Sequence, residues 1–102
     1  MPKRIQRRRT KGWRMPPNTR YVGRGSKWGN CFDWQFYMQT HGVSEREAKQ
    51  WAKDSFAAVW TKYAGGAYKV YLDLLRGQDV ACWCGLNDPC HGDVLIDLAN
   101  PK

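Results

Sequence analysis

The chain has 102 residues, 42% of them hydrophobic and 14% aromatic, and a formal net charge of +8 at pH 7. This length allows one hydrophobic core, and the aromatic content excludes an intrinsically disordered chain. No stretch is apolar for long enough to form a transmembrane helix or a secretory signal. We therefore expect one domain over residues 1–102, located in the cytoplasm and without a membrane partner.

The positive charge is concentrated near the N-terminus. Residues 1–30 contain ten basic residues and no acidic one, whereas residues 31–102 contain seven basic and nine acidic residues. Residues 1–20 form a basic segment that either packs on the domain or is partly mobile. It could solubilise the protein, or it could bind polyanions through its cations and interleaved aromatic rings. The candidate nucleic-acid contacts are Arg7, Arg8, Arg9, Lys11, Trp13 and Arg14.

In chain order, the first expected elements are short strands. Residues 4–9 (RIQRRR) could form a first strand, and residues 10–19, which include Pro16-Pro17, read as a loop. Residues 21–24 indicate a second strand. The glycine-punctuated stretch GSKWGN, residues 25–30, then indicates another loop.

The central part of the chain predicts two helices. Ser44 and Glu47 have the spacing of a capping box, and apolar residues recur at helical spacing from Ala48 to Tyr63. We expect this helix to end at Gly65-Gly66, and a second helix to cover residues 67–76.

The C-terminal part predicts a strand, a loop and a helix. Residues 79–84 alternate so that Val80, Cys82 and Cys84 share one face. The loop 85–89 leads to a final helix that ends near Asn100-Pro101. Strands mixed with helices indicate a small α/β domain, although a helix-rich module with a two-stranded ribbon is also compatible.

The decapeptide CWCGLNDPCH, residues 82–91, is the strongest chemical signal in the sequence. One hypothesis is a zinc site with four ligands, Cys82, Cys84, Cys90 and His91. Two observations oppose it: the side chains of adjacent residues diverge, and the spacing is not the common one of structural zinc sites. A purely structural role, with buried cysteines and a histidine bound to a carbonyl, is another interpretation.

The same decapeptide could instead form a catalytic site. Asp88-Pro89 suits the start of a helix, which would place Cys90 and His91 in its first turn. That position favours a thiolate, so Cys90 becomes a candidate nucleophile and His91 a candidate general base. Cys84, at the end of the preceding strand, would face them.

In sequence order, RIQRRRTKGWRMP, YVGRGSKWGN, the ACWC segment, CHGDVL and LAN resemble an uncharacterised family of short phage and bacterial proteins, domain of unknown function 4326. The resemblance runs from Arg4 to Asn100. Two positions depart from it: Cys31 replaces a typical proline after Gly29-Asn30, and Gly25 stands where members often have proline. The last quarter also resembles a second uncharacterised family, number 488. Both resemblances imply a Rossmann-like sheet with flanking helices.

That fold would bring two loops together at the carboxyl ends of the strands. The glycine loop would supply phosphate-binding groups to a pocket shared with the decapeptide: Arg24, Ser26, Lys27 and Asn30. We therefore expect a small basic domain that binds a nucleotide or nucleic acid, with Cys90 and His91 available to process it. The alternatives are a zinc-stabilised nucleic-acid-binding module and a phage protein that binds an acidic host protein.

Overall fold

The structure is a computed structural model that describes residues 2–101. It contains three strands, β1 (Arg4–Gln6), β2 (Thr19–Tyr21) and β3 (Asp79–Cys82). It also contains four helices, α1 (Trp34–His41), α2 (Glu45–Tyr63), α3 (Lys69–Leu75) and α4 (His91–Ala99). The predicted α/β class is confirmed. The strands are shorter than predicted, and β2 begins and ends earlier than the predicted 21–24.

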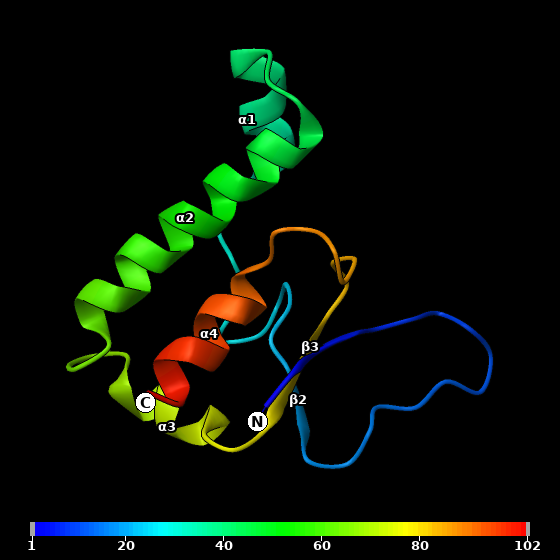
Figure 1. The fold of residues 1–102 in the computed structure, drawn as a ribbon, viewed down its shortest axis with the longest axis vertical. Coiled ribbons are helices and arrows are strands. Elements are labelled where there is room, and N and C mark those ends of the chain that lie inside the picture. Colours follow the sequence, from blue (N-terminus) through cyan, green and yellow to red (C-terminus); the bar gives the residue numbers. More distant parts are fainter. Residues whose placement is uncertain (1, 102) are drawn as a thin grey trace.

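The three strands form one parallel sheet in the order β1-β3-β2. The central strand therefore comes last in the sequence, and Ala81 lies opposite both Ile5 and Tyr21. Because all strands run in the same direction, their carboxyl ends lie at one edge of the sheet. The loops 7–18, 22–33 and 83–90 all leave from that edge (Figure 1).

Helix α4 connects the sheet to the other helices. It contacts β1 and β3 on one side and α2 and α3 on the other, so that it lies between β3 and α2 in Figure 1. Gly92 in its first turn permits this close approach: a Cβ atom there would lie 3.0 Å from Arg4 Cδ and 3.4 Å from Val80 Cγ2. The start of α4 is thus held directly against the sheet.

The hydrophobic core lies between the sheet, α4 and α2. Helix α2 buries a stripe of four residues at intervals of four: Ala48, Ala52, Phe56 and Trp60. The interior of the domain also contains Val22, Val80 and Leu95, which are fully buried. The predicted helix thus presents the expected apolar face, and its Ser44 side chain accepts a hydrogen bond from Glu47 N, as the capping box requires.

Helix α1 was not predicted from the sequence. Asp33 caps its N-terminus by accepting hydrogen bonds from the backbone N–H groups of Gln35 and Phe36, and Gly42 ends it with a φ of 65°. The helix buries no residue completely, and rests on α2 through stacked Tyr37 and Trp51 rings, whose centroids are 4.1 Å apart.

Over residues 2–101, no helix has both the length and the apolar character needed to cross a membrane.

Candidate ligand pocket and cysteine cluster

A pocket of about 510 Å³ lies at the carboxyl edge of the sheet. All three loops that leave this edge contribute to its wall, together with α2. Four aromatic residues line it, Tyr21, Phe32, Trp34 and Trp83. Its volume lies within the range of small-molecule sites, and its position is where open parallel sheets bind ligands.

The structure brings together only part of the predicted phosphate-binding set. Arg24 and Asn30 line the pocket beside Cys84, Cys90 and His91, whereas Ser26 and Lys27 do not. The Ser26 hydroxyl donates to Gly23 O at 2.6 Å and accepts from Trp28 N, so it fixes the turn. Lys27 faces a separate cavity, with its ammonium 5.7 Å from the Tyr71 ring centroid.

Asn30 shapes the pocket through internal hydrogen bonds. Its amide nitrogen donates to Ala52 O on α2, and its amide oxygen accepts from Phe32 N. Arg24 differs, because its side chain is exposed while its backbone carbonyl is fixed by the Tyr21 hydroxyl at 2.9 Å. Of the two predicted residues that reach the pocket, Arg24 is therefore the one available to a ligand.

Arginine and aromatic side chains alternate along the pocket rim. The Arg7 guanidinium lies 4.8 Å from the ring centroids of both Tyr21 and Trp83, and Arg9 lies 5.0 Å from Trp83 on the pocket side. Arg7 is thus held between two rings, and its Nε is buried without a hydrogen-bond partner among the described residues. Trp83 keeps 40% of its surface exposed.

The other predicted nucleic-acid contacts lie in the long loop between β1 and β2. Arg8, Lys11 and Arg14 are exposed there, outside the pocket. Trp13 is half-buried and closes a turn by donating its backbone N–H to Thr10 O at 3.0 Å. The basic residues among the predicted contacts therefore have three different environments. Arg7 lies between two aromatic rings, Arg9 lines the pocket, and the other three are exposed outside it.

Lys49 is a basic pocket residue that the sequence analysis did not select. It pairs with Asp88 at 3.2 Å and Glu45 at 3.5 Å, and lies 4.9 Å from the Trp34 ring centroid. Its charge is thus largely compensated. Among residues 2–101, neither Arg9 nor Arg24 has an ion-pair partner, so these two guanidinium groups carry the uncompensated positive charge of the pocket.

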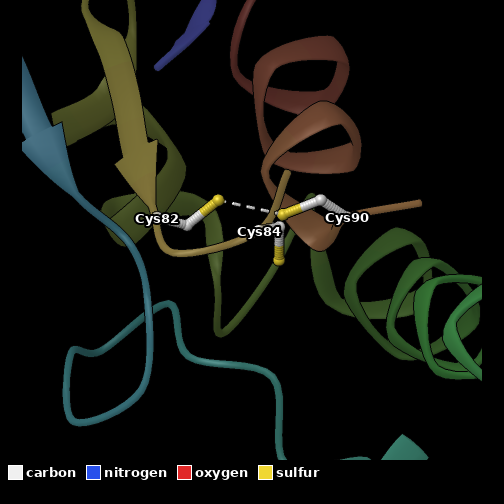
Figure 2. A group of neighbouring side chains, drawn as sticks. All are labelled: Cys82, Cys84 and Cys90. Carbon is white, nitrogen blue, oxygen red and sulfur yellow. Dashed lines mark hydrogen bonds between the residues drawn. The ribbon is translucent and has the colours of Figure 1, made fainter. Parts of the chain in front are cut away.

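Three cysteine sulfurs meet at the inner wall of the pocket. The Sγ atoms of Cys82, Cys84 and Cys90 all lie within 4.8 Å of one another, and those of Cys82 and Cys90 are 3.1 Å apart. Figure 2 shows these two sulfurs turned toward each other, with the Cys84 sulfur at a third corner. Cys82 and Cys90 are buried, Cys84 is half-buried, and all three are free thiols. Cys31 is an exposed free thiol and is not part of the cluster.

Because the three sulfurs lie close together, their thiol groups differ in pKa. Hydrogen bonds from Cys84 and Cys90 lower the pKa of Cys82 to about 2. Hydrogen bonds to Cys82 raise the pKa of Cys84 to about 11, and those to Cys82 and Cys84, together with burial, raise that of Cys90.

The expected start of the last helix was wrong. Cys90 itself is the N-cap of α4, and its sulfur accepts a weak hydrogen bond from Gly92 N at 3.5 Å. Asp88 instead belongs to the preceding turn, with its carboxylate bound to Lys49. The pKa of Cys90 is raised by its hydrogen bonds with Cys82 and Cys84 and by burial, whereas a place in the first helical turn was expected to favour the thiolate.

His91 is buried between the cysteines and the sheet. Its Nε2 lies 2.7 Å from the Val22 carbonyl, which can only accept, so Nε2 carries the proton. Burial lowers the pKa of His91 and favours this neutral form. Its Nδ1 is then an acceptor 3.8 Å from Cys90 Sγ. The adjacency predicted for Cys90 and His91 is present, and the ring is also anchored as the structural interpretation expected.

Arg4 organises the loop that carries these residues, and the sequence analysis did not single it out. Its guanidinium donates to the carbonyls of Gly85, Leu86 and Asp88 and pairs with Asp93 at 3.0 Å. Only 6% of its side chain is exposed. A residue of β1 thereby fixes the loop 83–90, more than 75 positions away in the sequence.

The cysteine cluster could hold a metal ion. Three sulfurs at these separations supply three of the four ligands of the predicted zinc set. His91, the fourth predicted ligand, does not belong to the group of mutually close ligand atoms. Its Nε2 is engaged by Val22, and only its Nδ1 faces the cluster.

Comparison with known proteins supports the first of the two family resemblances seen in the sequence. No curated protein and no solved structure matches the chain. The model of one family, described as "Domain of unknown function (DUF4326)", matches residues 5–101. That match covers nearly the whole sequence, and the chain therefore belongs to the DUF4326 family.

Proposed function

We propose that the protein binds a nucleotide, free or as a unit of a nucleic acid, in the pocket at the carboxyl edge of the sheet. One observation carries the proposal: the uncompensated guanidinium groups of Arg9 and Arg24 line the same pocket as the exposed Trp83 ring. Guanidinium groups bind phosphate oxygens through paired hydrogen bonds, and an indole ring stacks on any base.

The expected binding mode follows from these side chains. A base stacks on the free part of Trp83, whose orientation Arg7 supports, while Arg9 and Arg24 contact the phosphate. Tyr21 and Asn30 are committed to the protein by their hydrogen bonds and act as fixed walls. Because each base has a stackable face, this arrangement selects nucleotides as a class rather than one base.

The exposed cations of the β1–β2 loop support binding of longer nucleic acids. Arg8, Lys11 and Arg14 continue the positive charge beyond the pocket, along a loop that extends from the sheet in Figure 1. Neutralisation of additional phosphates by such residues increases affinity without sequence preference. A single-stranded nucleic acid with one nucleotide in the pocket and its neighbours along the loop fits this distribution.

The decisive experiment is a titration of the full chain with AMP and with a short oligo(dT), followed by tryptophan fluorescence and calorimetry. Trp83→Ala should weaken both ligands by about 5-fold to 150-fold, because a stacked base contributes roughly 1–3 kcal/mol. Arg24→Glu should weaken them comparably, since a phosphate contact is replaced by repulsion. Lys62→Glu, a charge reversal in the last turn of α2, is the matched control and should change nothing. Unchanged affinity in Arg24→Glu would overturn the pocket proposal.

The cysteine cluster supports a second proposal, namely that a zinc ion stabilises the domain. Thiolate-rich sets favour zinc, and a structural zinc ion contributes directly to folding. The observation that favours it is the mutual approach of three sulfurs from the end of β3 and the start of α4. A chelator should then lower the unfolding midpoint, and an unchanged midpoint would oppose it.

A further inference from the structure

We propose that Cys82, Cys84 and Cys90 bind one zinc ion through three thiolates and leave its fourth coordination position open to the ligand pocket. A closed four-ligand site would only stabilise the fold, whereas a three-ligand site accepts an external ligand. This inference rests on the proposed zinc site, goes beyond stabilisation of the fold, and does not depend on nucleotide binding.

The positions of the sulfurs fit a three-thiolate centre. Zinc–sulfur bonds of about 2.3 Å in tetrahedral geometry place sulfurs about 3.8 Å apart. The three sulfurs lie within 4.8 Å of one another and occupy three corners in Figure 2. The closest pair, Cys82 and Cys90, is 3.1 Å apart, so a bound ion requires shifts of less than about 1 Å.

Among the described residues, no fourth residue joins the group of mutually close ligand atoms. His91 does not belong to the group of atoms that all lie within 4.8 Å of one another, although its Nδ1 is an acceptor 3.8 Å from Cys90 Sγ while its Nε2 donates to the Val22 carbonyl. The nearby carboxylates are also engaged, Asp88 by Lys49 and Asp93 by Arg4. All three cysteines line the pocket, and the half-buried Cys84 is the most accessible of them, so we expect an external ligand to reach the ion from the pocket.

The surroundings suit a centre with a net charge of −1, the sum of one Zn²⁺ and three thiolates. The Arg4 guanidinium is almost fully buried, and its positive charge lies on the loop between Cys84 and Cys90, where it donates to the carbonyls of Gly85 and Asp88. Gly92 N donates to the Cys90 sulfur. Such hydrogen bonds from outside the ligand set orient thiolates and compensate their charge. Arg4 also holds the loop between Cys84 and Cys90, which fixes the spacing of the sulfurs.

The first measurement is metal content combined with thiol reactivity in the full chain. We expect one zinc per chain by mass spectrometry. N-ethylmaleimide should modify one thiol in the native protein, the exposed Cys31, and four after denaturation with chelator. A metal-free protein would overturn the proposal. So would two thiols that stay unreactive after denaturation without reductant, because that result identifies a Cys82–Cys90 disulfide.

Variants then identify the ligands. Cys84→Ser should lose zinc, while Cys31→Ser, the matched control, and His91→Gln should keep one zinc per chain. Circular dichroism shows whether Cys84→Ser remains folded, and the wild-type measurements decide the proposal even if it does not. Loss of zinc in His91→Gln, with the fold retained, would show a Cys₃His site and refute the open position.

The open position itself is tested by replacing zinc with Co²⁺. Imidazole or 2-mercaptoethanol should shift the visible absorption bands of the cobalt protein, because either can occupy a free position. Absent any shift, the site is closed and the proposal fails. Arg24→Glu should still bind cobalt and respond to both probes. Failure of nucleotide binding and failure of the open metal site are therefore separate results.

Discussion

Two loops leave the carboxyl edge of the same sheet and differ in almost every property. Loop 83–90 is short, and Arg4 binds three of its carbonyls while a turn joins Asp88 N to Gly85 O. Loop 7–18 is longer, exposed and basic, and it extends away from the helices in Figure 1. Its Arg7 side chain is held by aromatic rings rather than by carboxylates.

The difference indicates that the two loops have different functions. Groups that must keep a fixed geometry, such as the sulfurs of Cys84 and Cys90, lie on the loop that Arg4 holds in place. The third sulfur belongs to Cys82 at the end of β3. Cations that neutralise successive phosphates of a polyanion do not need a fixed geometry, and they lie on the exposed loop 7–18. Arg9 and Trp83 lie where the two loops meet at the pocket rim.

The largest effect should come from releasing the short loop. Arg4→Met leaves three carbonyls and Asp93 without their donor, and we expect the free energy of unfolding to fall by about 3 kcal/mol. Urea unfolding followed by circular dichroism measures this loss. Arg8→Met, at an exposed position of the long loop, is the control and should cost less than about 0.5 kcal/mol. Equal losses in both variants would remove the contrast between the loops.

A smaller effect should follow from neutralising the long loop. When Arg8, Lys11 and Arg14 are all replaced by serine, the slope of log affinity against log salt for oligo(dT) should decrease by about 2, because each phosphate contact contributes about 0.7. AMP affinity should not change, since these side chains lie outside the pocket. The control Lys62→Ser/Lys69→Ser removes charges elsewhere and should retain the slope. A retained slope in the triple variant would mean that the loop does not follow the nucleic acid.

The smallest effect concerns loop 22–33, which leaves the same edge of the sheet. Ser26→Ala should lower the free energy of unfolding by about 1 kcal/mol, because it removes two hydrogen bonds that fix the turn. AMP affinity should remain within about twofold of wild type, because Ser26 lies outside the pocket. Thermal unfolding and the fluorescence titration measure the two quantities. A tenfold loss of affinity with unchanged stability would instead make Ser26 a ligand contact.

Local patterns were sufficient to predict much of the fold. The capping serine and the apolar stripe of α2 lie within residues 44–63, and the alternation that predicted β3 lies within residues 79–84. Helix α1 escaped prediction because it buries no residue and so has no apolar stripe. Its boundaries were nevertheless readable, since Asp33 and Gly42 are typical cap residues at the correct spacing.

The candidate site was predictable in its residue types but not in its geometry. Proximity in sequence brought Cys82, Cys84, Cys90 and His91 to attention, yet only the fold shows that His91 turns its Nε2 to Val22. Arg4 was inaccessible to sequence reasoning because its partners lie more than 80 positions away. Asn30 and Ser26 looked like ligand contacts, whereas their polar atoms are used within the protein.

The central position of β3 has a consequence for how the chain folds. β1 and β2 pair only with β3, so both must wait for a strand that is synthesised some sixty residues or more after them. No sheet can form on the ribosome until residues 79–82 have emerged, although α2 can form earlier from its local contacts. Folding should therefore be limited by closure of two long chain segments around one four-residue strand, which is a slow step for a domain of this size.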